Sequence, residues 1–566
     1  LLDKIKQIRA FIAAAPQDEN TGNLLSYLSD LEKDVNGKKY GLVFEEHREE
    51  IDEVLDTHTP VLTEDKDLFI DNGGQMNFLI EGDNLASLKL LEKTHKGKID
   101  LIYIDPPYNT GNKDFIYDDS FIDKNDLFSH SKWLSFIKHR LLIARNLLTK
   151  RGAIFISIDD NEQSPLKVLC DEIFGAENFV TCLVWAAGRK NDSKYISVSH
   201  EYMLCYVKSM EYLKTNKIVW KQRKQGIDDI YKEYEQLKKK YGSDYREMSS
   251  ALKQWYKNLP ENHPARNHSH YNFIDETGIY FPSDISWPGG GGPKYEVLHP
   301  ITHKPVRVPN RGWVYPTKER MQEIISQKLV HFGDDETSVP CKKTYLKDNE
   351  MSTPYSVFYK DGRAATKRLR TIMGENVFQN PKDEEILESI IEFAALYNST
   401  ILDFFAGSGT TGHAVMKLNA EDGGNRKFIL CTNNENGICR DVTYERIRRV
   451  IDKENYAASL KYYKVDYVPI SDRMYYEYAD ELLRHIRELV ELENGINFTG
   501  NEEIAIVLTE DELAAFIADK DRFAKCRRLY MGHDLLPDEA QETALFKNKI
   551  EISIIPDYYY RDLQEG

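Results

Sequence analysis

The sequence lacks any run of about 18 apolar residues, the length that a membrane-spanning helix requires. Its first residues, Leu1 to Lys4, also lack the charged and then apolar order of a secretory signal peptide. Integral membrane proteins and exported proteins have one or the other. We therefore expect a cytoplasmic protein with no membrane partner.

Paired cysteines and nucleotide-binding lysines are missing as well. The seven cysteines form no CxxC pair and have no histidines at zinc-finger spacing, so we expect reduced, mostly buried thiols and no bound metal. The glycines of 289–292 and those around Gly407 are not followed by the lysine of a phosphate-binding loop. The sequence therefore contains no recognisable ATPase motif.

Positive charge is outweighed overall, because 92 Asp and Glu face 75 Lys and Arg and the formal net charge is -17. Taken alone, this value argues against a nucleic-acid-binding protein. Residues 355–382 are an exception, with six cations and only two acidic side chains. Four of the cations, Arg363, Lys367, Arg368 and Arg370, are the predicted contacts to a nucleic-acid backbone. A solvated basic loop is the alternative.

A chain of 566 residues predicts three or four domains. Apolar residues at helical spacing predict an N-terminal helical segment over 1–60. Short apolar runs that end in polar turns predict buried parallel strands in 61–185 and again in 351–453. A polar, Tyr-rich stretch over 186–350 separates these two halves and is predicted to be an insertion. Residues 454–566 form a separate C-terminal domain, with alternating strand patterns near Ile504 and Ile552.

The sharpest motif is Asp105-Pro106-Pro107-Tyr108, directly after the predicted strand 99–104. Two prolines end a strand and stiffen the chain, which fixes where nearby carbonyls and side chains point. The exocyclic amine of a base is a poor nucleophile that carries two hydrogens. Asp105 and the Pro106 carbonyl are able to accept one hydrogen bond each from such an amine. Tyr108 offers a face on which an extruded base stacks. These four residues are the predicted catalytic set.

The second motif, 403–412, follows the predicted strand 400–403 and opens a helix. Gly407 and Gly409 allow a sharp turn, and the amides of a helix N-terminus attract a carboxylate. A nicotinamide cofactor would suit such a turn equally well. Glu435, after the predicted strand 428–431, is placed to bind ribose hydroxyls. Ligands of open α/β sheets bind beyond the carboxyl ends of the strands, so both motifs are predicted to border one crevice.

Taken together, these motifs resemble the β-class amino-methyltransferases of DNA, and most of the chain resembles the modification (Mod) subunits of type III restriction-modification systems. The resemblance implies an α/β fold: a Rossmann-like, seven-stranded mixed-sheet methyltransferase core with helical N-terminal and α+β C-terminal extensions. It implies that 61–185 is the catalytic half, 351–453 the cofactor half and 186–350 an inserted target-recognition domain.

The resemblance also implies S-adenosylmethionine as the cofactor. Asp83 would contact its adenine, and Asn380 and Lys382 would close over it. Phe404, Gly407, Gly409 and Thr410 would surround its methionine end, and Asp403 is a further expected cofactor-binding residue. Such subunits dimerise, bind double-stranded DNA and pair with a restriction subunit that translocates and cleaves DNA.

The expected reaction is therefore site-specific methyl transfer to adenine N6 by base flipping. Cytosine-N4 transfer uses the same geometry, although Asp rather than Ser at position 105 favours adenine. A DNA-specificity module that recruits a nuclease and a nicotinamide-dependent oxidoreductase are the alternatives from other classes. His200-Glu201-Tyr202 has the residue types of a metal or catalytic site, but with no second ligand at helical spacing it is interpreted as structural.

Overall fold

The computed structural model describes residues 8, 11–12, 44–111, 116–117, 120–121, 128–186, 195–261, 263–470 and 481–558. These residues divide into two compact units. The larger consists of Leu1–Val219 together with Tyr355–Gly566, and the smaller of Trp220–Pro354. Most of the helices predicted in 1–60 lie outside the described residues. Within the described residues, no helix has the length and apolar content needed to cross a membrane.

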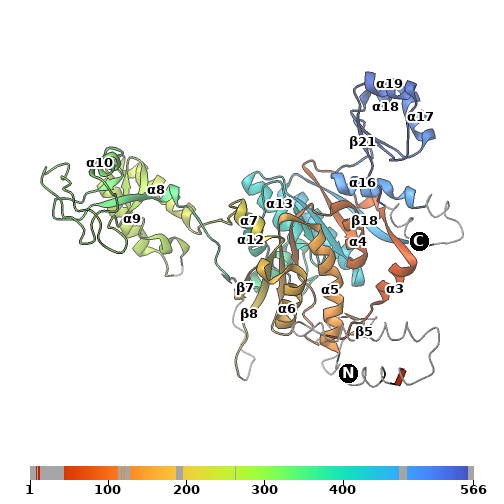
Figure 1. The fold of residues 1–566 in the computed structure, drawn as a ribbon, viewed down its shortest axis with the longest axis horizontal. Coiled ribbons are helices and arrows are strands. Elements are labelled where there is room, and N and C mark those ends of the chain that lie inside the picture. The colour runs from red at the N-terminus through yellow and green to blue at the C-terminus, as the bar shows by residue number, and fades with distance from the viewer. Residues whose placement is uncertain are drawn as a thin grey trace. The chain divides into compact units, whose positions relative to one another are not determined.

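The larger unit is built on a mixed sheet that has ten strands within the described residues. In sheet order they are β1 (His58–Glu64), β18 (Ala458–Pro469), β2 (Gln75–Glu81), β17 (Lys427–Thr432), β16 (Thr400–Asp403), β3 (Ile99–Ile104), β6 (Leu148–Ile158), β8 (His200–Val207), β7 (Phe179–Ala186) and β15 (Val357–Tyr359). β1 and β8 run antiparallel to their neighbours, and the remaining pairs are parallel. Figure 1 shows the sheet at the centre of this unit.

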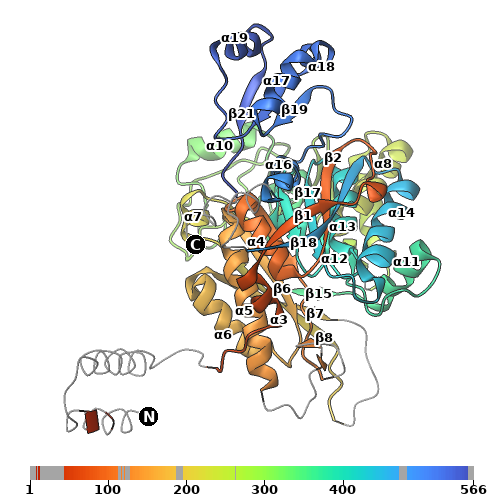
Figure 2. The ribbon, with the colours of Figure 1, turned by 90° about the vertical axis from the view of Figure 1, so that its right-hand side faces the viewer.

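Helices cover both faces of the sheet (Figure 2). One group consists of α4 (Asn84–His95), α5 (Ser129–Leu147), α6 (Gln163–Phe174) and α16 (Ile486–Asn494). The other consists of α11 (Arg363–Met373), α12 (Glu384–Ala394), α13 (Thr410–Asp422) and α14 (Glu445–Glu454). Two short helices, α3 (Glu50–Thr57) and α7 (Met210–Thr215), lie beside β1 and β6.

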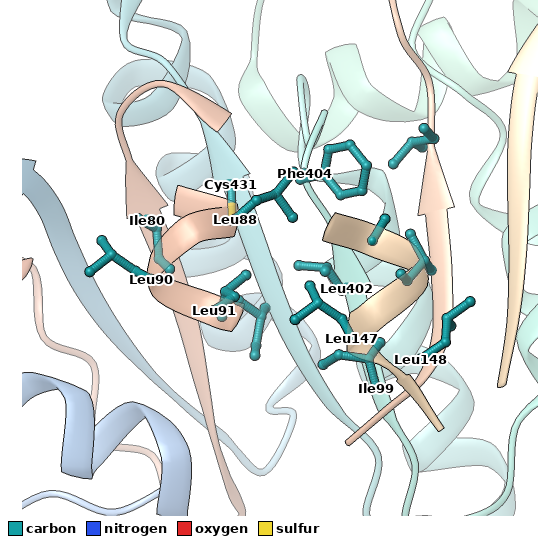
Figure 3. Packing of buried hydrophobic residues seen from close by; sticks show 14 of the residues in the cluster. Ile80, Leu88, Leu90, Leu91, Ile99, Leu147, Leu148, Leu402, Phe404 and Cys431 are labelled. Atoms are coloured by element: carbon teal, nitrogen blue, oxygen red, sulfur yellow. The ribbon is translucent and has the colours of Figure 1, made fainter. Parts of the chain in front are cut away.

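Burial on both faces explains why the central strands are almost continuously apolar. Side chains of α4 and of the end of α5 meet those of β2, β16 and β17 in one core, which includes Leu88, Leu147, Leu402 and Cys431 (Figure 3). Burying such side chains contributes roughly 1.5–3 kcal/mol each. The core holds the carboxyl ends of the central strands in fixed register.

The predicted fold class, a mixed α/β sheet with helices on both faces, is confirmed. The sheet is wider than the seven strands expected, because segments assigned to other domains join it. β1 overlaps the predicted N-terminal segment, β18 comes from the predicted C-terminal domain, and β8 comes from the predicted insertion. Because β8 returns to the sheet, the smaller compact unit begins at Trp220 rather than at residue 186.

The smaller unit combines helices with a four-stranded antiparallel sheet. Its elements are β9 (Gln222–Arg223), α8 (Ile227–Tyr241), α9 (Tyr245–Asn258), β10 (Phe273–Asp275), β11 (Gly278–Ser283), α10 (Lys318–Ser326), β12 (Val330–His331), β13 (Cys341–Tyr345) and β14 (Met351–Ser352). The sheet order is β10-β11-β13-β12, and β9 pairs with β14. Its two apolar clusters give this unit a core of its own.

The C-terminal part of the larger unit contains a second, parallel sheet. Strands β19 (Ile504–Val507), β20 (Arg528–Met531) and β21 (Glu551–Ile554) alternate with α17 (Glu510–Ala518), α18 (Lys520–Lys525) and α19 (Glu539–Lys547). The strands predicted near Ile504 and Ile552 are present. They are parallel, with helices between them, because the intervening chain is long enough for a crossover at each step.

Candidate active site

Four consecutive strands of the main sheet end in the predicted site. β2, β17, β16 and β3 are neighbours and run parallel, so the loops that follow them leave the same edge. These loops carry Asp83, Glu435, the stretch from Asp403 and the stretch from Asp105, in that order. The two motifs therefore lie at the same edge of the sheet, as predicted, although almost 300 residues separate them in the chain.

The loop after β3 is held by hydrogen bonds from α5 and the start of α6. The indole Nε1 of Trp133, a fully buried residue, donates to the carbonyl oxygen of Pro107 over 2.7 Å. Asn109 has a left-handed backbone, with φ of 57°, and donates its amide to Glu162 Oε1 over 2.6 Å. His130 Nδ1 lies 2.6 Å from the same oxygen. The rigidity predicted from two prolines is thus reinforced by side chains that anchor both ends of the turn.

Lys382 and Glu201 complete a polar cluster around Asp105 and Tyr108. The hydroxyl of Tyr108 donates to Glu201 Oε2 over 3.0 Å. Lys382 Nζ donates to the same carboxylate over 2.6 Å and also to the Tyr108 hydroxyl. It lies 3.2 Å from Asp105 Oδ1 and 4.8 Å from the centroid of the Tyr108 ring.

The carboxylate of Asp105 retains an acceptor with no hydrogen bond. Its Oδ1 atom is buried, and Lys382 approaches it as an ion pair without hydrogen-bond geometry. Burial raises the pKa of the Asp105 carboxyl, and the nearby Lys382 ammonium opposes that rise. Burial also raises the pKa of the Tyr108 hydroxyl, which stays protonated at neutral pH. The site thus offers an acceptor for an N-H donor beside an aromatic ring.

Asp403 shapes the second loop from inside the protein. Its Oδ1 accepts from the amide of Phe405 over 3.0 Å, and its Oδ2 accepts from the Thr411 hydroxyl over 2.5 Å. Burial raises the pKa of Asp403 to about 7. Both oxygens bind the loop itself, so Asp403 fixes the path of the chain into α13.

Gly407 and Gly409 form the turn, with φ of 48° and 74° in the left-handed region that favours glycine. Thr443 Oγ1 donates to the Gly407 carbonyl over 2.6 Å. Arg446, which is only 1% exposed, donates to the Ser408 carbonyl over 3.2 Å. It also donates to Thr410 Oγ1 over 2.8 Å. Hydrogen bonds from Arg446 in α14 and from Thr443, just before that helix, therefore hold the turn in place.

The other residues predicted to bind the cofactor occupy different positions. Phe404 is fully buried in the core, and Asp83 caps the N-terminus of α4 through the amide of Leu85. Glu435 is exposed and accepts from the Asn433 amide over 2.8 Å. Asn380 is exposed, with a left-handed φ of 53°. Asp83, Glu435 and Gly407 therefore lie on successive loops along this edge of the sheet.

The predicted DNA-binding residues lie on α11. Arg363 is exposed and pairs with Asp361 over 2.8 Å. Lys367 and Arg370 are exposed. Arg368 instead binds Asp383 over 2.9 Å and also contacts Glu384, which ties α11 to the start of α12. A phosphate contact by Arg368 would compete with these ion pairs.

Glu201 was not predicted as a site residue, because its segment was interpreted as structural. The structure places His200 beside Tyr202, with Nε2 and the hydroxyl 3.0 Å apart, and directs Glu201 to Tyr108 and Lys382. Since β8 is antiparallel to β6, the first residues of β8 lie at the edge where the parallel strands end. An antiparallel assignment of this strand would have revealed Glu201.

One group of possible metal ligands occurs among the described residues, formed by Glu49, Asp52 and His139. Glu49 already binds Arg140 over 2.6 Å, and Asp52 accepts from the amide of Glu49 over 2.9 Å. These contacts explain the cluster without a metal, because they join the start of α3 to α5.

A family model described as DNA methylase matches residues 99–444, more than half of the chain. This chain belongs to that DNA methylase family. It is 37% identical over 388 residues to the Mod subunit of the type III restriction-modification enzyme EcoP15I of Escherichia coli, covering 63% of this chain and 58% of the relative. It is 34% identical over 363 residues to the type II methyltransferase M.KpnI of Klebsiella pneumoniae, covering 62% of this chain and 79% of the relative.

The resemblance to Mod subunits is thereby confirmed for this DNA methylase. The chain spans about three fifths of the length of the Mod subunits that it matches. Among solved structures, a DNA modification methylase of Thermus thermophilus, complexed with S-adenosyl-L-methionine, is 12% identical. That match covers 68% of this chain and 97% of the other, with a TM-score of 0.31.

Proposed function

We propose that this DNA methylase transfers a methyl group from S-adenosylmethionine to the N6 amine of an adenine in double-stranded DNA. The observation that carries the proposal is the buried Oδ1 of Asp105, which has no hydrogen-bond partner and lies in the loop after β3, next to the strand β16 that leads to the Gly407 turn. Membership of the DNA methylase family supports the reaction class. Similarity to type III Mod subunits supports a role in a restriction-modification system.

The proposed cofactor site is the row of loops that follow β2, β17 and β16. Asp83 and Glu435 are the candidates for the adenine and ribose ends, because each offers carboxylate oxygens on a partly or fully exposed loop residue. The Gly407 turn and the first amides of α13 receive the methionine carboxylate. Bound there, S-adenosylmethionine supplies an electrophilic methyl group on a sulfonium centre.

Asp105 and its neighbours prepare the amine for attack. The Asp105 carboxylate and the Pro106 carbonyl accept the two N6 hydrogens, which leaves the nitrogen lone pair free to point at the methyl group. The N-C bond forms as the S-C bond breaks, and the surplus proton leaves nitrogen for Asp105 and then solvent. Stacking on Tyr108 contributes roughly 1 to 3 kcal/mol to holding the flipped base.

The smaller unit is the proposed target-recognition domain. It carries 21 Lys and Arg against 18 Asp and Glu, whereas the chain as a whole has a net charge of -17. Its positive balance suits a polyanionic partner. Arg363, Lys367 and Arg370 remain candidate phosphate contacts. We propose further that the chain forms a homodimer in the cytoplasm and assembles with a restriction subunit, as its relatives' names imply for them.

The test is to express the chain in a methylation-free host and to identify the modified nucleoside and its sequence context. Nucleoside mass spectrometry that shows N6-methyladenine at one motif supports the proposal. N4-methylcytosine would establish the cytosine alternative, and unmodified DNA would refute methyl transfer. Asp105→Ala serves as the control, because it removes the acceptor and leaves the Gly407 turn intact, so it should bind S-adenosylmethionine normally without methylating DNA.

A further inference from the structure

The ammonium group of Lys382 lies among the groups to which the target adenine is assigned. It donates to Glu201 Oε2 over 2.6 Å and to the Tyr108 hydroxyl, and it lies 3.2 Å from Asp105 Oδ1. It also lies 4.8 Å from the Tyr108 ring centroid and 5.5 Å from that of Trp185. A cation in this position has the same acceptor and the same aromatic ring that an extruded amino-base would use.

The backbone on both sides of Lys382 fixes this placement. The residue before it, Pro381, is buried, and Asn380 turns the chain through a left-handed conformation. The residue after it, Asp383, caps α12 through the amide of Glu385 at 3.0 Å and binds Arg368. The Lys382 side chain is only 12% exposed. The contacts of Lys382 are therefore built into the fold and do not belong to a free surface lysine.

Glu201 reaches the same place from a different strand. It stands at the start of β8, at the edge where the neighbouring parallel strand β6 ends. One of its oxygens, Oε2, accepts from both Tyr108 and Lys382. Glu201 thus provides a second anionic partner for the ammonium, separate from Asp105.

We infer that Lys382 is a positioning residue of the base-accepting site, and that the flipped adenine takes over its contacts with Asp105 and Tyr108 while Glu201 retains the ammonium. The inference deepens the proposed function and rests on it. It moves Lys382 from the cofactor side, where the family resemblance placed it, to the side of the accepting base.

The charges around Asp105 support this role. The groups that face it are Lys382, the carboxylates of Glu201 and Asp403, and the phenols of Tyr103 and Tyr108. Burial raises the pKa of Asp105, Lys382 lowers it, and Glu201 raises it further. Lys382 itself stays charged, because the two carboxylates raise its pKa against the effect of burial. Lys382 therefore keeps Asp105 ionised, in the form that accepts a hydrogen from an amine.

The decisive measurement is the pH dependence of single-turnover methyl transfer to a DNA duplex that contains the target motif. The rate falls in acid as Asp105 becomes protonated. Lys382→Met should move this acid limb upward by about 1 pH unit or more, because the ammonium that Glu201 holds near Asp105 is removed. Glu201→Gln should move it downward, because a like charge is removed. Lys382→Arg, which keeps the charge, should stay near the wild-type profile.

Cofactor affinity, measured by calorimetry without DNA, distinguishes the two sides of the site. Lys382→Met should bind S-adenosylmethionine within about threefold of wild type. Lys417→Met is the matched control, since Lys417 is also partly buried and ion-paired, to Glu388 at 2.8 Å, outside this cluster. It should leave both the acid limb and cofactor affinity unchanged. Thermal melting confirms that each variant is folded, and Glu201→Gln tests the inference by itself if Lys382→Met does not fold.

The exchange of ammonium for base has a separate readout. With 2-aminopurine at the target position, Lys382→Met should increase the fluorescence of bound DNA, because no cation competes with the base. Lower fluorescence than wild type would overturn the exchange. An unmoved acid limb, or a tenfold loss of cofactor affinity in Lys382→Met, would overturn the assignment to the accepting site. Wild-type protein that transfers no methyl group would instead refute the proposed function itself.

Discussion

Trp133 donates its indole hydrogen to the carbonyl oxygen of Pro107 over 2.7 Å, which joins α5 to the loop that carries Asp105. The indole is fully buried, so this bond is shielded from water. It fixes the second proline of the motif, and with it the direction in which Tyr108 leaves the loop. The precision of the proposed accepting site therefore depends on a residue outside the motif.

Replacing Trp133 with Phe should expose this dependence. The variant keeps an aromatic ring in the core but leaves the Pro107 carbonyl without its partner, which costs about 1–3 kcal/mol of stability. Urea denaturation measures that loss. We also expect the rate of methyl transfer to fall by about tenfold at saturating cofactor, because a small misplacement of reacting groups is costly. A stability loss with a wild-type rate would show that the loop keeps its geometry unaided.

Tyr108 has two roles that substitutions separate. Its ring is the proposed stacking platform, and its hydroxyl bonds to Glu201 and Lys382. Tyr108→Ala should reduce kcat/KM far more than Tyr108→Phe, because base stacking contributes roughly 1 to 3 kcal/mol. Steady-state kinetics on one DNA duplex provides the comparison. Equal losses in the two variants would assign the function to the hydroxyl.

Arg446 should control cofactor affinity without touching the cofactor. It supports the turn at Ser408 and Thr410, and Arg446→Met removes its hydrogen bonds to both residues. We expect S-adenosylmethionine to bind at least about tenfold more weakly, equivalent to about 1.4 kcal/mol. Arg426→Met is the matched control, because Arg426 is similarly buried but binds Asp422 at the end of α13. Similar affinity losses in both variants would indicate general destabilisation.

The cations of α11 should divide into two classes. Arg368→Ala removes the hydrogen-bonded cation from the buried carboxylates of Asp383 and Glu384 and should lower the melting temperature. Lys367→Ala and Arg370→Ala remove exposed charges and should instead reduce the salt dependence of DNA binding. The slope of the logarithm of the binding constant against the logarithm of salt concentration should become shallower by about 0.9 for each phosphate that is no longer neutralised. Binding measured from low to moderate salt tests this. Unchanged slopes would place the phosphate contacts elsewhere.

The sequence was sufficient to predict the strands that carry the two motifs, because buried parallel strands have continuous apolar runs that end abruptly in polar loops. It also predicted that Asp105 and Gly407 lie at one edge, since that follows from the topology of such sheets. The conformations of Asn109 and Gly409 agree with the preference of Asn and Gly for left-handed backbone.

The remainder depends on pairings that periodicity does not encode. The direction of β8 places Glu201 at the edge of the sheet that carries the Asp105 loop, and nothing in the local sequence indicates that direction. The ion pairs of Arg368 were equally hidden, because a cation in a basic segment looks exposed until its acidic partners from another helix are known. The hydrogen bond of Trp133 to the Pro107 carbonyl likewise became visible only in the structure.

The pairing of β9 with β14 brings the two ends of the smaller unit together. Met351 lies opposite Arg223 in that pair, so the chain enters and leaves the smaller unit at adjacent points. Exchange of the intervening segment for another of different size and sequence requires only that its ends be equally close. The smaller unit is therefore exchangeable as one segment, and under the proposed function such an exchange would change the DNA sequence that is recognised without altering the Asp105 and Gly407 loops.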